Sequence, residues 1–145
     1  MLGKLFGNND KKIQEAIDSG DFSALPTEMI DDLAKDLIVT TEPNMPEYRV
    51  VERIEIITAE CVFGMNLFRD FFASMRDIFG GRSGAAQKVL RDSRKTCLTE
   101  LKREALIAGA NAIIGVDLDY SEISGDGKSM LFLVASGTAV RVEKI

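Results

Sequence analysis

The sequence predicts an α+β domain, with a small sheet covered by helices on one face. Three patterns support this fold class. Residues 48–62 are rich in β-branched side chains, residues 65–108 contain apolar positions at helical spacing, and residues 114–142 contain two segments typical of strands. The order strand, helix, helix, strand, strand then gives one sheet with both helices on the same side.

Length and composition fit this single domain. The chain has 145 residues, of which 46% are hydrophobic and 28% charged, so it can bury a core and has room for a short appendage but not for a second full domain. It contains no histidine, no tryptophan and two cysteines. The absence of histidine excludes catalytic triads with imidazole and histidine-ligated metal sites.

The charge distribution and the lack of targeting segments exclude further classes of function. The net charge of −5 arises in the first 45 residues, which carry four lysines and nine acidic residues, while the rest of the chain is balanced. Such a surface gives no support for nucleic-acid binding, which needs a basic face. The near-apolar run at residues 130–140 is too short to span a membrane, and residues 1–7 lack a secretory signal. We therefore expect a cytoplasmic protein that contacts neither nucleic acid nor membrane.

Residues 1–45 read as an acidic helical extension followed by a linker. Residues 10–19 have one apolar helical face, and after Pro26 the apolar residues Ile30, Leu33, Ala34 and Leu37 recur at helical spacing. Residues 40–46 are polar and contain two prolines, which favours a domain boundary there, so residues 46–145 form the main domain. The extension either packs on this domain as a helical hairpin or serves as a docking arm for a protein partner.

The main domain begins with a long, bent strand at residues 48–62, which ends at Gly64. Residues 65–79 then place six apolar side chains within one helical arc: Phe68, Phe71, Phe72, Met75, Ile78 and Phe79. Gly80–Gly84 interrupts the helical pattern. A longer helix follows as far as Gly109, with a narrow apolar stripe: Leu90, Cys97, Leu101, Ala105 and Ala108.

The last two strands predict how the protein assembles. Apolar and polar residues alternate at 114–121, and the turn at 125–127 leads to a hairpin partner in which both alternating sets are apolar at residues 130–135. A monomer covered by helices on one face would then expose Leu131, Leu133 and Ala135. We expect a homo-oligomer for this reason. The alternative is that the N-terminal helices cover this face within one subunit.

Five short motifs in the main domain resemble the bacterial YbjQ family: Phe68-Arg69-Asp70, Ala73-Ser74-Met75-Arg76-Asp77, Gly80-Gly81-Arg82-Ser83-Gly84, Gly109-Ala110-Asn111-Ala112 and Ala135-Ser136-Gly137-Thr138-Ala139. The resemblance runs from about residue 46 to residue 143. It implies a β-α-β-β unit of dodecin-like type that assembles into a ring, expected to be a pentamer. The family also carries a heavy-metal-binding label, and the resemblance supplies no reaction.

The loop at residues 80–84 is a candidate anion site. It opens onto a predicted helix N-terminus, where Gly81 and Ser83 could offer backbone N–H groups, and Arg82 could join Arg69 and Arg76 in a cationic cluster. The alternative is a tight turn between helices, in which Arg82 forms a salt bridge across a subunit contact. No resident cofactor is expected, apart from a metal ion if one is bound.

Two sets of residues are candidates for a metal. Cys61 could be gathered from several subunits of a ring, whereas Cys97 lies on the apolar stripe of its helix and is expected to pack as a small apolar residue. Asp117 and Asp119 share one strand face and could hold a hard cation with Glu55 or Glu60. The alternatives are that the cysteines are structural residues and that the two aspartates belong to a solvated strand face.

The function that these features favour is a ring-forming binding or scaffold protein, with a small anion or metal at a subunit interface. The alternative is an enzyme that orients an anionic substrate with the three arginines and uses Asp70 or Asp77 as general base. Residues 136–138 offer two hydroxyls, but no histidine is available to activate them, so we expect these small residues to serve close packing.

Overall fold

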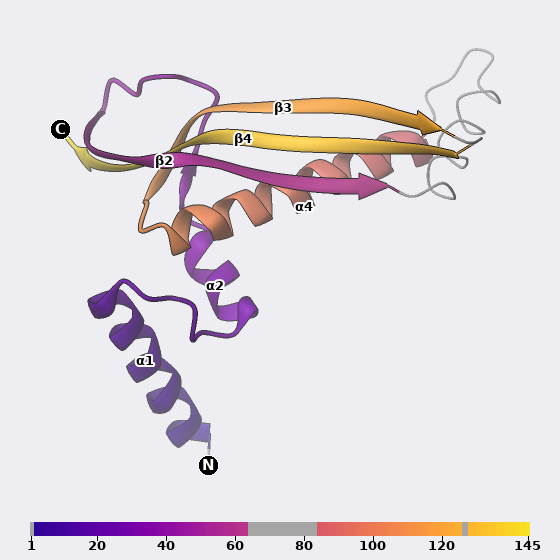
Figure 1. Cartoon of the computed structure of the whole chain (residues 1–145). Helices are drawn as coiled ribbons and strands as arrows, with labels where there is room; N and C mark the ends of the chain where they lie inside the picture. The colour runs from indigo at the N-terminus through magenta and orange to yellow at the C-terminus, as the bar shows by residue number, and fades with distance from the viewer. Residues whose placement is uncertain (1, 64–83, 126–127) are drawn as a thin grey trace.

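The computed structural model describes residues 2–63, 84–125 and 128–145, and it confirms the α+β class. Four strands form one sheet in the order β1-β3-β4-β2, and helix α4 lies across one face of it (Figure 1). No helix among the described residues is long and apolar enough to cross a membrane. The described elements are α1 (Leu2–Ser19), α2 (Thr27–Ala34), β1 (Ile38–Val39), β2 (Tyr48–Phe63), α4 (Gly84–Ile107), β3 (Ala112–Gly125) and β4 (Lys128–Lys144).

Strand β4 is central, with β3 on one side and β2 on the other, both antiparallel to it. The three long strands, the β3–β4 hairpin and the helix that precedes Gly109 are therefore confirmed. The predicted helix at residues 65–79 lies outside the described residues. Two register irregularities, at Val50/Glu52 and Arg53/Glu55, disturb the regular pairing of β2, as expected for the bent strand that the sequence predicts.

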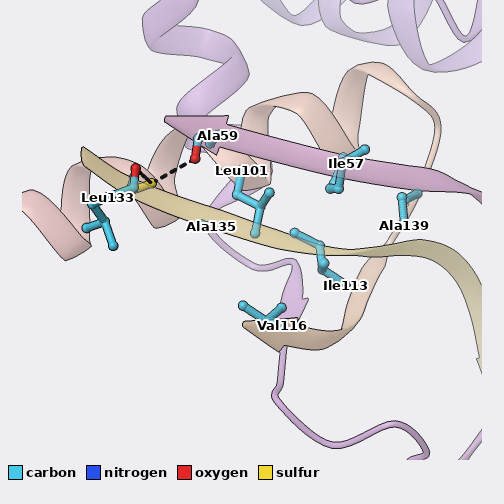
Figure 2. Close-up of a cluster of buried hydrophobic side chains, with 11 residues drawn as sticks. Ile57, Ala59, Leu101, Ile113, Val116, Leu133, Ala135 and Ala139 are labelled. Atoms are coloured by element: carbon cyan, nitrogen blue, oxygen red, sulfur yellow. Dashed lines mark hydrogen bonds between the residues drawn. The ribbon is translucent and has the colours of Figure 1, made fainter. Parts of the chain in front are cut away.

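Helix α4 packs through the predicted stripe. Cys97, Leu101 and Ala105 are fully buried, and they lie against strand residues that include Ile57 and Leu133 (Figure 2). The helix ends in a Schellman motif, in which Ala110 N–H donates to Ala105 O at 2.9 Å and Gly109 N–H donates to Leu106 O at 3.0 Å. Gly109 has φ +89°, the left-handed conformation that this termination requires.

The prediction of which sheet face is left without a helix was wrong. Leu133 and Ala135 are 0% exposed because α4 of the same chain covers them, and Leu131 is half-buried. The face that α4 leaves uncovered carries the other alternating set, which includes Phe132 and Val134. Both sets are apolar in this part of β4, so periodicity could not decide which one the helix would bury.

The N-terminal helices do not cover the sheet. Helix α2 contacts α4, where its Met29 and Leu33 belong to a small core cluster with Leu106 of α4. Helix α1 is attached through its last turn, where Ala16 is buried in the same cluster. The alternative in which these helices cover the open side of the sheet was therefore wrong. A protein partner for the extension stays a prediction.

Residues 38–45, which the sequence assigned to the end of the extension, pack into the main body. Ile38–Val39 pair with β3 as a short parallel strand. Thr40 N–H then donates to Ile113 O at 3.0 Å, and Gly115 N–H donates to Glu42 O at 2.9 Å. Met45 is buried in a core cluster with β3 and β4. The segment is thus held by sheet hydrogen bonds, while a division at residue 45 into separate folding units stays a prediction.

A bulge in β3 makes these hydrogen bonds available. The pairing of β3 with β4 shifts between Ile114 and Asp117, and Gly115 there has φ +60°. Gly137 lies opposite the bulge. A Cβ atom at this position would lie 2.6 Å from Ile113 Cγ2 and 3.1 Å from Val116 Cγ2. The absence of a side chain at Gly137 therefore allows the two strands to stay paired around the bulge.

A partly buried ion pair fastens α2 to α4. Arg103 donates two hydrogen bonds to the Asp31 carboxylate, each of 2.8 Å. These hydrogen bonds lower the pKa of Asp31 despite an opposing effect of burial. Because the folded-state pKa is depressed, the stabilisation is present above the unfolded-state pKa of about 3.9 and is lost as pH falls through the folded-state value.

We expect Asp31→Asn to destabilise the chain by about 1 kcal/mol at pH 7, because it removes the charge that Arg103 pairs with. Urea unfolding measures the change. Asp32→Asn is the matched control, since Asp32 lies on the same helix and pairs with the exposed Lys35, so its effect should be close to zero. Equal losses in the two variants would contradict a special role for the Asp31–Arg103 pair.

Candidate functional site

Described residues leave the side of the sheet opposite α4 uncovered, except at the end where Met45 packs against Ala112 and Val140. We call this uncovered side the open face. It is apolar at both ends: Ile56 is 79% exposed, Ile123 55% and Val62 48%. Its described residues are Ile56, Thr58, Glu60 and Val62 from β2, Met130, Phe132, Val134, Ser136 and Thr138 from β4, and Asp117, Asp119, Ser121 and Ile123 from β3.

The middle of the open face is acidic. Glu60 and Asp119 both pair with Val134, from opposite sides of β4, and Asp117 lies two residues from Asp119. None of the residues just named is a lysine or arginine, while Arg53, which pairs with Val140, lies farther along the same side of β4. The predicted hard-cation residues Asp117 and Asp119 are both exposed here, with Glu60 two strands away, whereas Glu55 pairs with Ala139 farther along β4. In the part of the chain that the structure describes, no three candidate ligands come together as a metal group.

Helix α4 carries the opposite charge on its solvent side. Lys88, Arg91 and Lys95 are exposed and recur at i, i+3 and i+7, which places them along one side of the helix. We call these three residues the basic stripe. None of the ion pairs among the described residues uses them. One subunit therefore presents an acidic, partly apolar sheet face and a separate basic helix surface.

The two cysteines lie together between β2 and α4. Cys97 is 0% exposed and its Sγ donates to Ala59 O at 3.1 Å, while Cys61 is half-buried and packs against the same core cluster. Burial raises the pKa of both thiols, and the charge of Glu100 raises both further. Both cysteines are free thiols in this structure. The sequence placed Cys97 correctly in the core, but it gave no sign that Cys61 would lie beside it.

The remaining predicted site residues divide into two groups. The anion-site residues Arg69, Arg76, Gly81, Arg82 and Ser83 lie outside the described residues, as do the general-base candidates Asp70 and Asp77. Residues 136–138 are described, and Gly137 does serve close packing as expected. The side chains that approach Gly137 most closely are Ile113 and Val116 of β3.

Asn111 is a structural residue whose contacts the sequence alone did not reveal. Its side-chain amide donates to Val142 O at 2.9 Å, and its Oδ1 accepts from Val142 N–H at 2.8 Å. It thus fastens the start of β3 to β4 with two hydrogen bonds where the chain leaves α4. The position just after a glycine that ends a helix was the available signal, because asparagine there often bonds nearby backbone groups.

Comparisons with known proteins agree with this architecture. Residues 37–143 match the model of a family named YbjQ_1, described as "Putative heavy-metal-binding". The chain is 46% identical over 106 residues to UPF0145 protein PM1668 of Pasteurella multocida, a match that covers 73% of this chain and 99% of that protein. Residues 1–36 lie before the part that the family model matches.

A solved structure supports the same fold at lower sequence similarity. It is a protein of unknown function from Pediococcus pentosaceus, assigned to the DUF74 family, and it is similar with a TM-score of 0.54 at 15% identity. The match covers 74% of this chain and 98% of that one, and it is evidence for the fold alone. From the family match and the 46% identity, we conclude that the chain belongs to the YbjQ family, also named UPF0145, whose function is uncharacterised.

Proposed function

We propose that the chain is a self-assembling binding protein, in which subunits join head to tail into a ring. The observation that carries this proposal is the open face, where the strongly exposed Ile56, Val62 and Ile123 are covered by no described residue. Apolar groups exposed together on a sheet are typical of an interface. The partner to which we commit is a second copy of the chain.

Charge supports a head-to-tail contact over a two-fold one. Two open faces placed against each other would bring Glu60, Asp117 and Asp119 of both copies together, and like charges across an interface are unfavourable. The basic stripe on α4 complements these carboxylates. A contact between the open face of one copy and the basic stripe of the next is heterologous, and such contacts generate a closed ring when the rotation between copies closes.

The finer parts of the proposal concern ring size and ligand. The resemblance to the family favours a pentamer and a binding or scaffold role in the cytoplasm. Each head-to-tail contact would set carboxylates of one subunit beside the cations of its neighbour. A small charged ligand, either an anion or a metal ion, would find its partners at such a contact.

The experiment is a charge reversal with rescue. We expect the wild-type chain to form particles several times its 15.9 kDa mass. Reversing two cations, Arg91→Glu with Lys95→Glu, should weaken the contact at least tenfold by placing like charges across it. Asp117→Lys with Asp119→Lys should do the same. Light scattering over a range of protein concentrations measures particle mass and its loss.

Combining all four substitutions restores opposite charges and should recover the assembly. Lys12→Glu is the control, because this exposed cation lies on α1, away from both surfaces. A wild-type particle of about 16 kDa at micromolar concentration would overturn the proposal. Assembly that survives both reversals would instead exclude this particular contact.

A further inference from the structure

We infer that Cys61 and Cys97 together form a two-coordinate site for a soft divalent heavy-metal ion, of which mercury(II) is the representative. The site lies inside one subunit, between β2 and α4. The inference deepens the binding function proposed above by naming a ligand class and two ligating residues. It does not depend on ring assembly.

The backbone contacts of Cys97 place its sulfur beside Cys61. Its Sγ lies 3.1 Å from Ala59 O and 3.7 Å from Leu133 O. Leu133 is the direct cross-strand partner of Cys61, and Ala59 lies two residues before Cys61 on the same strand face. The Cys97 sulfur thus rests on the part of the sheet from which the Cys61 side chain rises toward α4. Figure 2 shows Ala59 on β2 and Leu133 on β4, the two residues whose carbonyl groups the Cys97 sulfur contacts.

The burial of the two thiols differs in a way that suits metal entry. Cys97 is 0% exposed, so a cation cannot reach it directly from solvent. Cys61 is half-buried and lies near the end of β2. A metal would therefore bind the Cys61 thiol first and transfer inward to complete its coordination at Cys97.

The number and type of ligands select the metal. Among the described residues no group of three or more His, Cys, Asp or Glu side chains is arranged to hold a metal, so a tetrahedral zinc site does not fit the described part of the chain. Thiolates prefer soft cations. The two sulfur atoms therefore suit a soft ion that binds two thiolate ligands in a linear arrangement.

The surroundings select a divalent over a monovalent ion. The sulfurs lie against an apolar core cluster that includes Leu101 and Leu133. A bis-thiolate complex of a divalent cation is neutral, whereas that of a monovalent cation keeps one negative charge, which is costly to bury. Glu60 and Glu100 lie close enough to affect Cys97 electrostatically and would oppose that negative charge further.

Binding displaces protons and involves no oxidation or reduction. Two S–H bonds break, two sulfur–metal bonds form, and two protons leave to solvent. Burial and the charge of Glu100 raise the pKa of both thiols, Cys61 and Glu60 also raise that of Cys97, and the Ala135 backbone N–H partly opposes the shift at Cys97. Both thiols are therefore protonated at neutral pH, and the apparent affinity should rise about 100-fold per pH unit below these pKa values.

The test titrates the full chain with mercuric chloride in the presence of a small-molecule thiol competitor. We expect one mercury per chain by mass spectrometry, an ultraviolet sulfur-to-metal charge-transfer band and protection of both thiols from alkylation. Cys61→Ala should lose at least 100-fold in affinity, because one of two linked ligands is gone. Cys97→Ala should lose as much affinity. Cys61→Ala is the primary variant, because it changes a half-buried position and disturbs the fold less than a substitution at the fully buried Cys97.

Thermal unfolding separates a folded site from two thiols that meet only in the unfolded chain. Mercury bound to the native site should raise the unfolding midpoint of the wild-type chain and leave that of Cys61→Ala unchanged. A lowered midpoint, unchanged affinity in either cysteine variant, or equally tight binding of silver(I) would overturn the inference. Particle mass is measured on the same metal-free samples, so failure of the ring proposal is seen separately from failure of the metal site.

Discussion

Replacement of Leu101 by alanine is expected to lower the free energy of unfolding by about 4 kcal/mol. Leu101 is 0% exposed and is the large side chain between Cys97 and Ala105 on the buried stripe of α4. The residues on either side along the stripe are small, so they cannot extend into the space that Leu101 would leave. The loss therefore combines the transfer of buried methyl groups with the cost of a cavity between α4 and the sheet.

Urea unfolding at one fixed protein concentration measures this change. The matched control is Ile107→Ala on the same helix, because Ile107 is 42% exposed and should cost less than about 1 kcal/mol. Retained helical circular dichroism at zero urea would show that the Leu101→Ala chain still folds. A loss no larger than that of Ile107→Ala would contradict the view that this helix stripe is the centre of the core.

Gly137→Ala should destabilise the chain by about 3 kcal/mol, although it adds a single methyl group. The added Cβ would lie 2.6 Å from Ile113 Cγ2 and 3.4 Å from Ile114 O. Ile113 is itself 0% exposed, and its Cγ2 is bonded directly to Cβ, so rotation of a flexible chain end cannot relieve the contact. The strands must separate around the bulge or Ile113 must leave its packed position.

A double-mutant cycle with Ile113→Ala identifies the cause. If the clash with Ile113 dominates, Gly137→Ala should cost at least 1 kcal/mol less in the Ile113→Ala background than in the wild-type chain. Ser136→Ala is the neighbouring control, since this half-buried residue lies on the open face and should change stability by less than about 0.5 kcal/mol. Strict additivity of the two substitutions would contradict the steric explanation.

Most of the helices and strands were predicted from the periodic spacing of apolar residues. The stripe through Cys97, Leu101 and Ala105 predicted both the existence of α4 and the side that it buries, because this side is narrow and its opposite side is polar. Strands β3 and β4 were predicted with the correct pairing because a glycine-rich turn separates them. Where a segment has one apolar side, the sequence is enough to orient it.

The same reasoning failed at β4, where both sides are apolar. Val134 and Leu133 are equally suitable for a core by hydropathy, and the choice between them depends on where α4 lies. Side-chain patterns also did not reveal how residues 40–46 are held. Their prolines and polar side chains indicate a linker, and the structure adds backbone hydrogen bonds from Thr40 and Glu42 to the β3 bulge. Such bonds use backbone groups that nearly all residues share, so side-chain patterns do not reveal them.

The sequence by itself determined the fold class, the order of the strands along the chain, the buried stripe of α4 and the family. The tertiary structure decided which sheet face stays open, how the acidic and basic surfaces are separated, and that Cys61 and Cys97 lie together. The physical reason is the distance along the chain between the residues that make each feature. Periodicity reports each segment's own preference for burial, whereas faces, surfaces and thiol pairs arise from contacts between residues far apart in the chain.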